Sequence, residues 1–158
     1  MAWPARALVA AGALALAGCS LQLGDAQEVP RYVAVEADGV HLDVLDGMAE
    51  AEVPSGFSRF WQTQTGTLDA SIGIAPGAAP DAFVDAQLAS LGEVMDDLDV
   101  HDAGDGAAFF EGTGVNGKTY TGIAAVRGTT GVVVSSGSGL AEAVLRHVVD
   151  SVTPAERG

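Results

Sequence analysis

A glycine-rich segment at residues 112–119 has a spacing that could bind phosphate groups. Its sequence, GTGVNGKT, matches the pattern G-x-x-x-x-G-K-[ST] of nucleotide-binding P-loops. Such a loop needs a helix after it, because the helix N-terminus completes the phosphate site. Residues 120–123 are instead β-prone and interrupted by glycine, and no apolar strand ending in Asp follows to hold Mg²⁺. Asn116-Gly117 between two β-prone runs predicts a hairpin, so we expect neither a nucleotide nor any other cofactor.

The densest run of carboxylates extends from Asp96 to Asp105, with the sequence DDLDVHDAGD. Carboxylates this close together could bind Ca²⁺. Counted as an EF-hand loop from Asp97, the segment lacks Gly at the sixth position and Glu at the twelfth. A run of like charges is more typical of an exposed segment. We therefore expect a solvated connection between a helix and a strand, while Ca²⁺ binding stays open.

No arrangement of nucleophile, base and metal ligand stands out elsewhere. His41, His101 and His147 lie in three different expected elements, with His41 on the polar side of a strand and His147 on the outer side of the last helix. No G-x-S-x-G elbow surrounds any serine. The carboxylates are too many and too scattered to nominate a glycosidase pair. We therefore expect no catalytic residue and no metal site, and the chain is predicted not to be an enzyme.

The N-terminus has the three parts of a secretory signal peptide. A short basic start ending at Arg6 precedes the apolar run Ala7–Ala17, and small residues follow. The run is shorter than the ~20 residues that a membrane-spanning helix needs. The four residues Leu16, Ala17, Gly18 and Cys19 resemble the lipobox of bacterial lipoproteins. That resemblance implies cleavage before Cys19, which would carry diacylglycerol and palmitate. The alternative is a cytosolic N-terminal helix with a buried free cysteine.

The lipobox implies a domain plan and a location. Residues 1–18 are the expected signal peptide, 19–30 the lipidated Cys19 and a flexible tether, 31–154 a single domain, and 155–158 a tail. The protein is then exported and lipid-anchored to the outer face of the cell membrane, or to the outer membrane if the source has two membranes. Two or more acyl chains give a stable anchor, because each buried CH₂ contributes ~0.8 kcal/mol.

Composition excludes several classes of protein. The 158 residues include 7 Lys and Arg against 21 Asp and Glu, which gives a net charge of -14. Nucleic-acid binding needs clustered cations, so no nucleic-acid partner is expected. One cysteine excludes an internal disulfide framework and a zinc site built on cysteine pairs. Hydrophobic residues make up 48% of the chain, too many for a disordered acidic tail.

Hydrophobic spacing predicts the elements of the domain. Alternation predicts strands at residues 32–35, 40–44 and 68–74, and further strands at 107–113, 119–126 and 132–134. A helix is expected over 81–98, with an apolar stripe at Val84, Leu88, Leu91, Met95 and Leu98. A last helix would be capped by Ser138, stop at Pro154 and bury Ala141, Leu145, Val148 and Val152. This order indicates an α+β fold with an antiparallel sheet and two packed helices.

Phe57, Phe60 and Trp61 follow the turn Val53-Pro54-Ser55-Gly56. Aromatic side chains dominate buried surfaces, so core packing is the simpler interpretation. They could also form part of a ligand or partner surface. The spacing does not separate the two.

The layout of elements resembles the PsbP-like superfamily, which includes small actinobacterial lipoproteins. The resemblance rests on the turn at Val53–Phe57, the strand Phe109-Phe110-Glu111-Gly112 and the closing helix Val148–Val152. Phe57-Ser58 departs from the Gly-Trp of many members. The family implies an α/β/α sandwich that acts as a non-enzymatic binding or accessory domain.

Together these observations predict a membrane-anchored, non-catalytic binding or accessory lipoprotein of the cell envelope. Its partner would be a hydrophobic, lipid-like ligand, an envelope component or an exported protein. Its acidic surface would be repelled by anionic lipids and steered toward cationic partners. Two alternatives stay open. One is an envelope hydrolase or metal-dependent enzyme with an unrecognised site, and the other is a lipoprotein that excludes a phage or a toxin.

Overall fold

The computed structural model describes residues 30–63, 69–137 and 139–155. The folded unit begins at Arg31. The predicted signal peptide, the lipobox residues Leu16 to Cys19 and the tether up to residue 29 lie outside the described residues.

Ten strands and two helices make up the described part of this unit. The strands are β1 (Tyr32–Ala37), β2 (Val40–Leu45), β3 (Met48–Glu50), β4 (Arg59–Thr63), β5 (Ala70–Pro76), β6 (Asp96–Gly104), β7 (Ala107–Thr113), β8 (Thr119–Arg127), β9 (Thr130–Ser136) and β10 (Thr153–Pro154). The described helices are α2 (Pro80–Val94) and α3 (Glu142–Asp150). Two of the hairpins turn through Asp-Gly pairs, Asp38-Gly39 and Asp105-Gly106, in which both residues have positive φ, as a type I′ turn requires.

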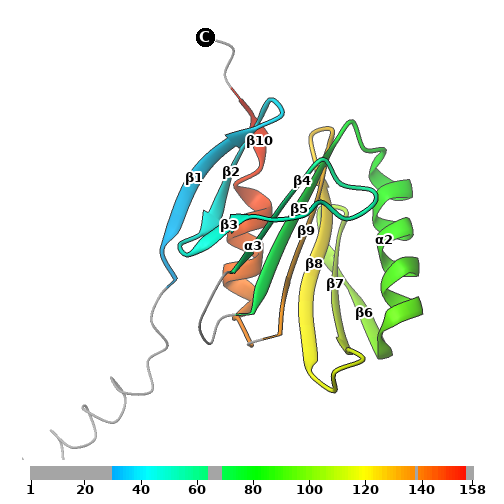
Figure 1. Cartoon of the computed structure of the whole chain (residues 1–158). Coiled ribbons are helices and arrows are strands. Elements are labelled where there is room, and N and C mark those ends of the chain that lie inside the picture. The colour runs from blue at the N-terminus through cyan, green and yellow to red at the C-terminus, as the bar shows by residue number, and fades with distance from the viewer. Residues whose placement is uncertain (1–29, 64–68, 138, 156–158) are drawn as a thin grey trace, which may run out of the picture. The chain divides into compact units, whose positions relative to one another are not determined.

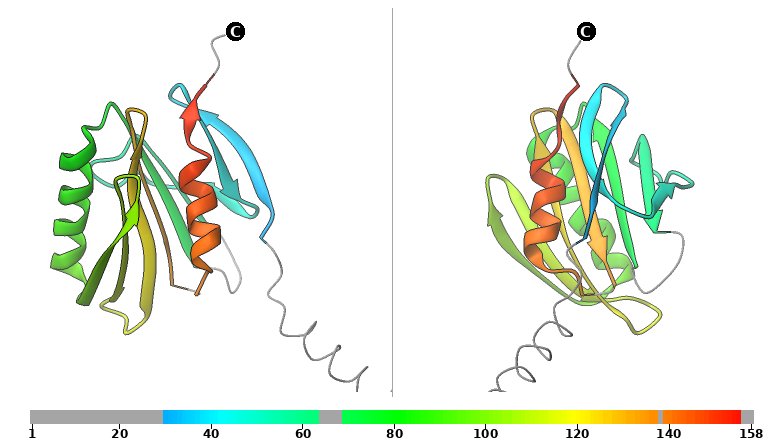
Figure 2. Two further views of the ribbon diagram at one scale, coloured as in Figure 1. Left: turned by 180° about the vertical axis from the view of Figure 1, so that it is seen from behind. Right: turned by 90° about the vertical axis from the view of Figure 1, so that its left-hand side faces the viewer.

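The strands form two antiparallel sheets. The larger has seven strands in the order β3-β4-β5-β9-β8-β7-β6, and the smaller has three in the order β1-β2-β10. Helix α2 covers one face of the large sheet, while α3 and the small sheet lie on the opposite face (Figure 1, Figure 2). The α+β class, the antiparallel sheet and the two packed helices are confirmed. The separate small sheet was not predicted, because strand periodicity does not say which strands pair.

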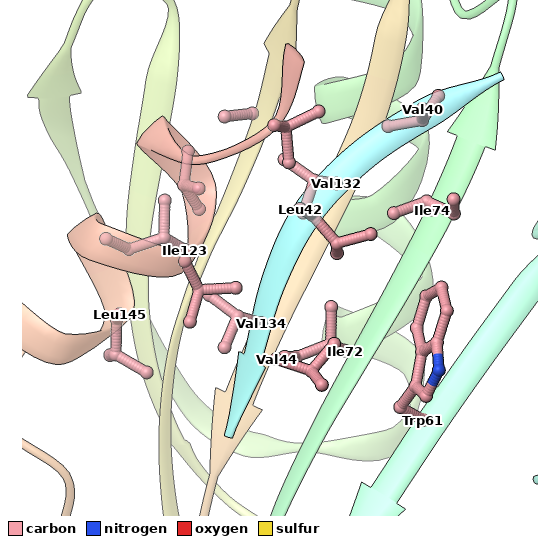
Figure 3. Close-up of a cluster of buried hydrophobic side chains, with 14 of the residues drawn as sticks. Val40, Leu42, Val44, Trp61, Ile72, Ile74, Ile123, Val132, Val134 and Leu145 are labelled. Atoms are coloured by element: carbon pink, nitrogen blue, oxygen red, sulfur yellow. The ribbon is translucent and has the colours of Figure 1, made fainter. Parts of the chain in front are cut away.

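The main core lies between the large sheet and the layer of α3 and β2. Alternate residues of β2 and β5, such as Leu42, Ile72 and Ile74, are fully buried there, because successive strand residues face opposite sides. Leu145, Val148 and Val149 of α3 close the cluster. Figure 3 shows the β2 side chains lying over those of β5, β8 and β9. This face of the sheet is therefore filled by aliphatic side chains.

The opposite face of the large sheet is built differently, because it is rich in glycine. Aromatic rings and a methionine lie directly on strand glycines. A Cβ added at these glycines would come within 2.3–3.1 Å of the covering side chain. The pairs are Gly73 with Phe57, Gly131 with Phe83, Gly122 with Phe110 and Gly112 with Met95. Missing side chains on the strands thus make room for large ones above them, which keeps this interior close-packed.

Helix α2 is shorter than predicted. It ends at Val94, and Met95 already has extended backbone angles; residues 96–104 form β6. The predicted helix over 81–98 and the predicted connection at Asp96–Asp105 are therefore both wrong in extent. The apolar stripe predicted too long a helix, because Met95 and Leu98 contact the same layer from the end of α2 and from β6. Met95 packs on Gly112, and Leu98 lies 3.9 Å from the Cβ position of Gly92. Hydrophobic spacing reports which residues reach the interior and not which backbone carries them.

The last helix also begins later than predicted. Ser138 is outside the described residues, and the residue that caps α3 is Ala141, without a side-chain hydrogen bond. Ala141 is exposed, so its predicted burial is wrong. Leu145, Val148 and Val152 are buried as predicted. Pro154 belongs to β10, which pairs with β2 instead of simply ending a helix.

An ion pair connects the small sheet to the large one. Arg59 of β4 lies 3.3 Å from a carboxylate oxygen of Asp38, in the β1–β2 turn, and 3.5 Å from Glu50. A hydrogen bond from the Ser58 hydroxyl, followed by one from Arg59, holds the pKa of Asp38 below its ordinary value. The same pairing raises the pKa of Arg59. Asp38 is therefore ionised across the neutral range.

We predict that Ser58→Ala and Arg59→Gln each raise the pKa of Asp38, measured by NMR titration of its carboxyl group. Because the folded pKa is the lower one, the stabilisation is present above the unfolded pKa and is lost as pH falls through the folded value. Denaturant melts should therefore separate both variants from the parent at neutral pH and converge below the folded pKa of Asp38. Ser58→Ala leaves the charge unchanged and so isolates the hydrogen bond. An Asp38 titration unmoved by both changes would contradict this account.

A candidate polar binding pocket

A cavity of about 290 Å³ opens at one end of the large sheet. Its residues come from β4, β5, β8 and β9 and from the ends of these strands. They are Gln62, Thr63, Asp69, Ala70, Ser71, Tyr120 and Ser135. Ser71 and Ser135 face the α2 side of the sheet, since they lie two residues along their strands from Gly73 and Val133 on that side. We call this cavity the polar pocket.

A pair of serine hydroxyls forms the floor of the polar pocket. Ser71 and Ser135 are direct neighbours in the pairing of β5 with β9, and their hydroxyl oxygens lie 3.0 Å apart. One of the two donates to the other. At the rim, the Thr63 hydroxyl oxygen accepts a hydrogen bond from the backbone N–H of Ala70 at 3.3 Å. The pocket therefore presents both donors and acceptors to its interior.

A chain of polar contacts forms the second wall. The ammonium group of Lys118 lies 3.2 Å from a carboxylate oxygen of Asp69. The Tyr120 hydroxyl donates to the same carboxylate at 3.5 Å and accepts from the Asn116 amide at 2.9 Å. The carboxylate of the pocket is thus balanced by a cation. An uncharged or zwitterionic polar ligand fits such a wall better than an anion does.

The segment that matches the P-loop pattern, residues 112–119, forms a hairpin in the structure. Residues 114–118 form the predicted hairpin turn, in which the Gly114 N–H donates to the Lys118 carbonyl at 2.8 Å. Strand β8 follows where a P-loop requires a helix. The lysine of this segment contacts Asp69, 49 positions away in the sequence. The hairpin is confirmed, and Lys118 forms an ion pair with Asp69, which lines the polar pocket.

Of the three aromatic residues in the predicted surface, Trp61 is in the core. It is 4% exposed and packs with the main cluster, so it cannot form part of a surface. Phe57 and Phe60 are half-buried on the α2 side, 6.3 Å apart between ring centroids, and Phe57 meets Phe83 of α2 edge-on at the same distance. Alternation along β4 separates Phe60 from Trp61. A ligand or partner role for Phe57 and Phe60 stays a prediction.

A serine, a histidine and an aspartate meet where α3 packs on β2. His147 Nε2 lies 2.8 Å from an Asp43 carboxylate oxygen, and the Tyr32 ring stacks on the imidazole at 3.8 Å. Burial, followed by the charge of Asp43, raises the pKa of Tyr32. The Ser151 hydroxyl donates to the Val148 carbonyl and accepts from the Asp43 N–H. It therefore does not donate to His147, the contact that activates the serine of a catalytic triad.

The other histidines are elsewhere. His101 stacks on Phe109 with centroids 5.2 Å apart and lies 3.8 Å from Asp99, while His41 is in β2. Within residues 30–63, 69–137 and 139–155, no three His, Asp or Glu side chains come together as metal ligands do. The carboxylates of Asp96–Asp105 are spread along a strand, with a bulge at Asp97, whose φ is positive.

Sequence reasoning missed the polar pocket. Its floor joins two serines 64 positions apart, and its carboxylate and tyrosine are 51 positions apart. The local signal is weak, consisting of single hydroxyl residues within apolar strands, such as Ser71 between Ala70 and Ile72. Strand pairing alone brings these residues together.

In the part of the chain that the structure describes, no helix is both long enough and apolar enough to span a bilayer.

The sequence and the structure were compared with known proteins. No family model matches the sequence, and a search of curated proteins also finds no match. Among solved structures, the chain is similar to the solution structure of cyanobacterial PsbP (CyanoP) from Synechocystis sp. PCC 6803. The identity is 11%, the match covers 82% of this chain and 95% of that chain, and the TM-score is 0.43. Values this low do not assign the chain to a family, so its function is argued from its own residues.

Proposed function

We propose that the protein is a non-catalytic binding or accessory lipoprotein of the cell envelope, with a PsbP-like domain held at the outer face of the cell membrane through a lipid on Cys19. The lipobox-like residues Leu16 to Cys19 support the anchor. The polar pocket supports binding. Its walls are built from hydroxyl and amide groups, and its carboxylate is ion-paired.

The polar lining carries the binding proposal and also narrows it. A ligand site needs a few convergent polar groups that fix orientation, and the Ser71–Ser135 pair with the Asp69–Lys118 pair supplies them. No histidine or cysteine is among the lining residues, so the pocket is suited to hydrogen bonding more than to proton transfer. A hydrophobic ligand fits it poorly. The space under α2, where an apolar groove would lie, holds Phe83, Val84 and Leu88 packed on the sheet.

Site-directed photo-crosslinking in intact cells tests this proposal. A photoreactive residue replaces Gln62, which is exposed and lines the pocket; the matched control replaces Thr153, which is exposed on β10. We expect a discrete polar envelope adduct at position 62 that is absent at 153, identified by mass spectrometry of both lipids and proteins. Ser71→Ala combined with Ser135→Ala should reduce this adduct, because it removes both floor hydroxyls.

Equal labelling at positions 62 and 153 would overturn the pocket as a binding site. The hydrolase alternative would require the Ser151 hydroxyl to turn from the Val148 carbonyl toward His147, which contacts Asp43. Turnover of an envelope ester by the purified protein, abolished by Ser151→Ala, would replace the binding proposal with that alternative.

A further inference from the structure

Among the described residues, strand β6 has no strand paired to its outer edge. It is the outermost strand of the seven-stranded sheet, with β7 on its inner side. At nine residues it is long for an edge strand. Bulges occur between Asp96 and Asp99 and between Asp102 and Gly104. Between them, residues 99–102 pair regularly with β7, so their outward backbone N–H and C=O groups can accept another strand.

Strand β6 contains four aspartates and no Lys or Arg. No Lys or Arg occurs between Arg59 and Lys118, a segment that contains all of α2, β6 and β7. Lys118, Arg59, Arg127 and Arg146 form ion pairs with carboxylates of other elements. Two of these arginines reach the C-terminal end of β6 through backbone oxygens, where Arg146 donates to the Ala103 carbonyl at 2.7 Å and Arg127 to the Asp105 carbonyl at 3.1 Å. On β6, the only such contact is from His101 to Asp99 at 3.8 Å, and it carries charge only when the histidine is protonated.

Two like charges also lie directly opposite each other here. Asp99 of β6 is the register partner of Glu111 of β7, and both residues are exposed. Like charges facing each other across a strand pair are destabilising. A cation placed beside Asp99 would relieve that repulsion. A positively charged neighbouring strand would therefore reduce the repulsion between Asp99 and Glu111, which is uncompensated in the free protein.

The same charges exclude a second copy of this chain as the occupant. Two β6 strands placed edge to edge would bring their Asp96–Asp105 segments together, and charged edges prevent this kind of self-pairing. The edge is therefore selective, because it repels an acidic strand and attracts a basic one. Val100, on the α2 side and 41% exposed, adds an apolar contact for an alternating strand.

We propose that β6 binds an extended, Lys- and Arg-rich segment of an exported protein as an additional strand of the large sheet. The proposal rests on the proposed binding function and names the chemistry of the protein partner, while its site is separate from the polar pocket. Backbone hydrogen bonds along residues 99–102 supply the docking geometry. The carboxylates of Asp99 and its register partner Glu111, on one face of the sheet, select the cationic side chains, while Val100 on the other face contacts the apolar ones.

The test uses the full-length protein in detergent micelles and two peptides of alternating Lys and Val. In the second peptide, proline replaces every valine, which keeps the charge and removes the N–H groups that a strand needs. We expect the first peptide to bind and to slow backbone hydrogen exchange in residues 99–102, and the second to do neither. Asp99→Asn with Glu111→Gln removes the two carboxylates that share the face of the peptide lysines. It should weaken binding about tenfold, a change on the order of that from removing two or three exposed ion pairs.

Asp81→Asn with Asp85→Asn is the matched control, because both residues are exposed on α2 and the charge change is the same. This control should retain nearly all of the affinity. Equal binding of the proline peptide, or an equal loss in the control, would reduce the effect to general electrostatics and overturn the proposal. Self-association of the parent protein through β6, detected by sedimentation, would overturn it too. Neither result bears on the crosslink at position 62, so failure here is distinct from failure of the pocket.

Discussion

Replacing Gly122 with alanine is expected to destabilise the domain by about 3 kcal/mol, at the upper end of the usual effect of overpacking a core. A Cβ at this position would lie 2.3 Å from Phe110 Cζ and 2.4 Å from the Val134 carbonyl oxygen. The ring could only yield by leaving a fully buried site. The carbonyl belongs to the ladder between β8 and β9 and cannot rotate away. Both neighbours therefore resist the added methyl group.

Urea unfolding followed by circular dichroism measures this change. A loss of about 3 kcal/mol is a large share of the 5–15 kcal/mol that typically stabilises a domain. Gly92→Ala provides the control, since it is the same substitution in α2, where the new Cβ would have only Leu98 at 3.9 Å. In a helix, alanine is favoured over glycine by up to about 1 kcal/mol, so this variant should be neutral or more stable. Equal stability of Gly122→Ala and the parent would refute the close approach of Phe110.

Cys19→Ser is expected to move the protein from the membrane fraction to the soluble fraction. The chain has one cysteine, so this substitution removes the only thiol to which a diacylglyceryl group could be attached. Anchoring by two or more acyl chains is strong, because each buried CH₂ contributes ~0.8 kcal/mol. Losing all of the chains leaves an acidic protein that anionic lipids repel. The expected change is therefore nearly complete.

Fractionation and metabolic labelling with an alkyne analogue of palmitate measure the outcome. The parent should be labelled and membrane-bound, while Cys19→Ser should be unlabelled and recovered in the aqueous phase. Ser20→Ala changes the neighbouring residue and keeps the thiol, so it should behave as the parent does. Membrane association of Cys19→Ser at the level of the parent would disprove the lipid anchor.

The sequence predicted the elements better than their boundaries. Alternating residues such as Leu42, Val44, Ile72 and Ile74 identified strands that the structure contains, because burial of one sheet face imposes a period of two. The helix boundary after Val94 was missed, because Met95 and Leu98 continue the helical spacing although they have extended backbone conformations. At these two positions, the spacing correctly predicted contact with the interior and wrongly predicted a helical backbone.

Some features of the candidate sites could be predicted from local sequence, and others depended on the tertiary structure. The hairpin at Asn116-Gly117 was predictable because turn chemistry is local. Trp61 is buried in the core, while its neighbours in β4 face the other side of the sheet. This difference was not predictable from the sequence, because it depends on which layer covers each side of β4. The edge position of β6 was equally hidden: strand order, and not any residue within Asp96–Gly104, makes this strand the last of the sheet.

The sequence by itself therefore determined the fold class, the acidic charge and the hairpin, because each depends on composition, period or neighbouring residues. The lipid attachment at Cys19 stays a prediction from the sequence. Tertiary structure decided the rest. It placed Ser71 beside Ser135 and Lys118 beside Asp69 to make a pocket. It also placed the Phe110 ring directly against Gly122, where a side chain would not fit. These features join residues from strands far apart in the chain, and only the pairing of the strands brings them within hydrogen-bond or van der Waals distance.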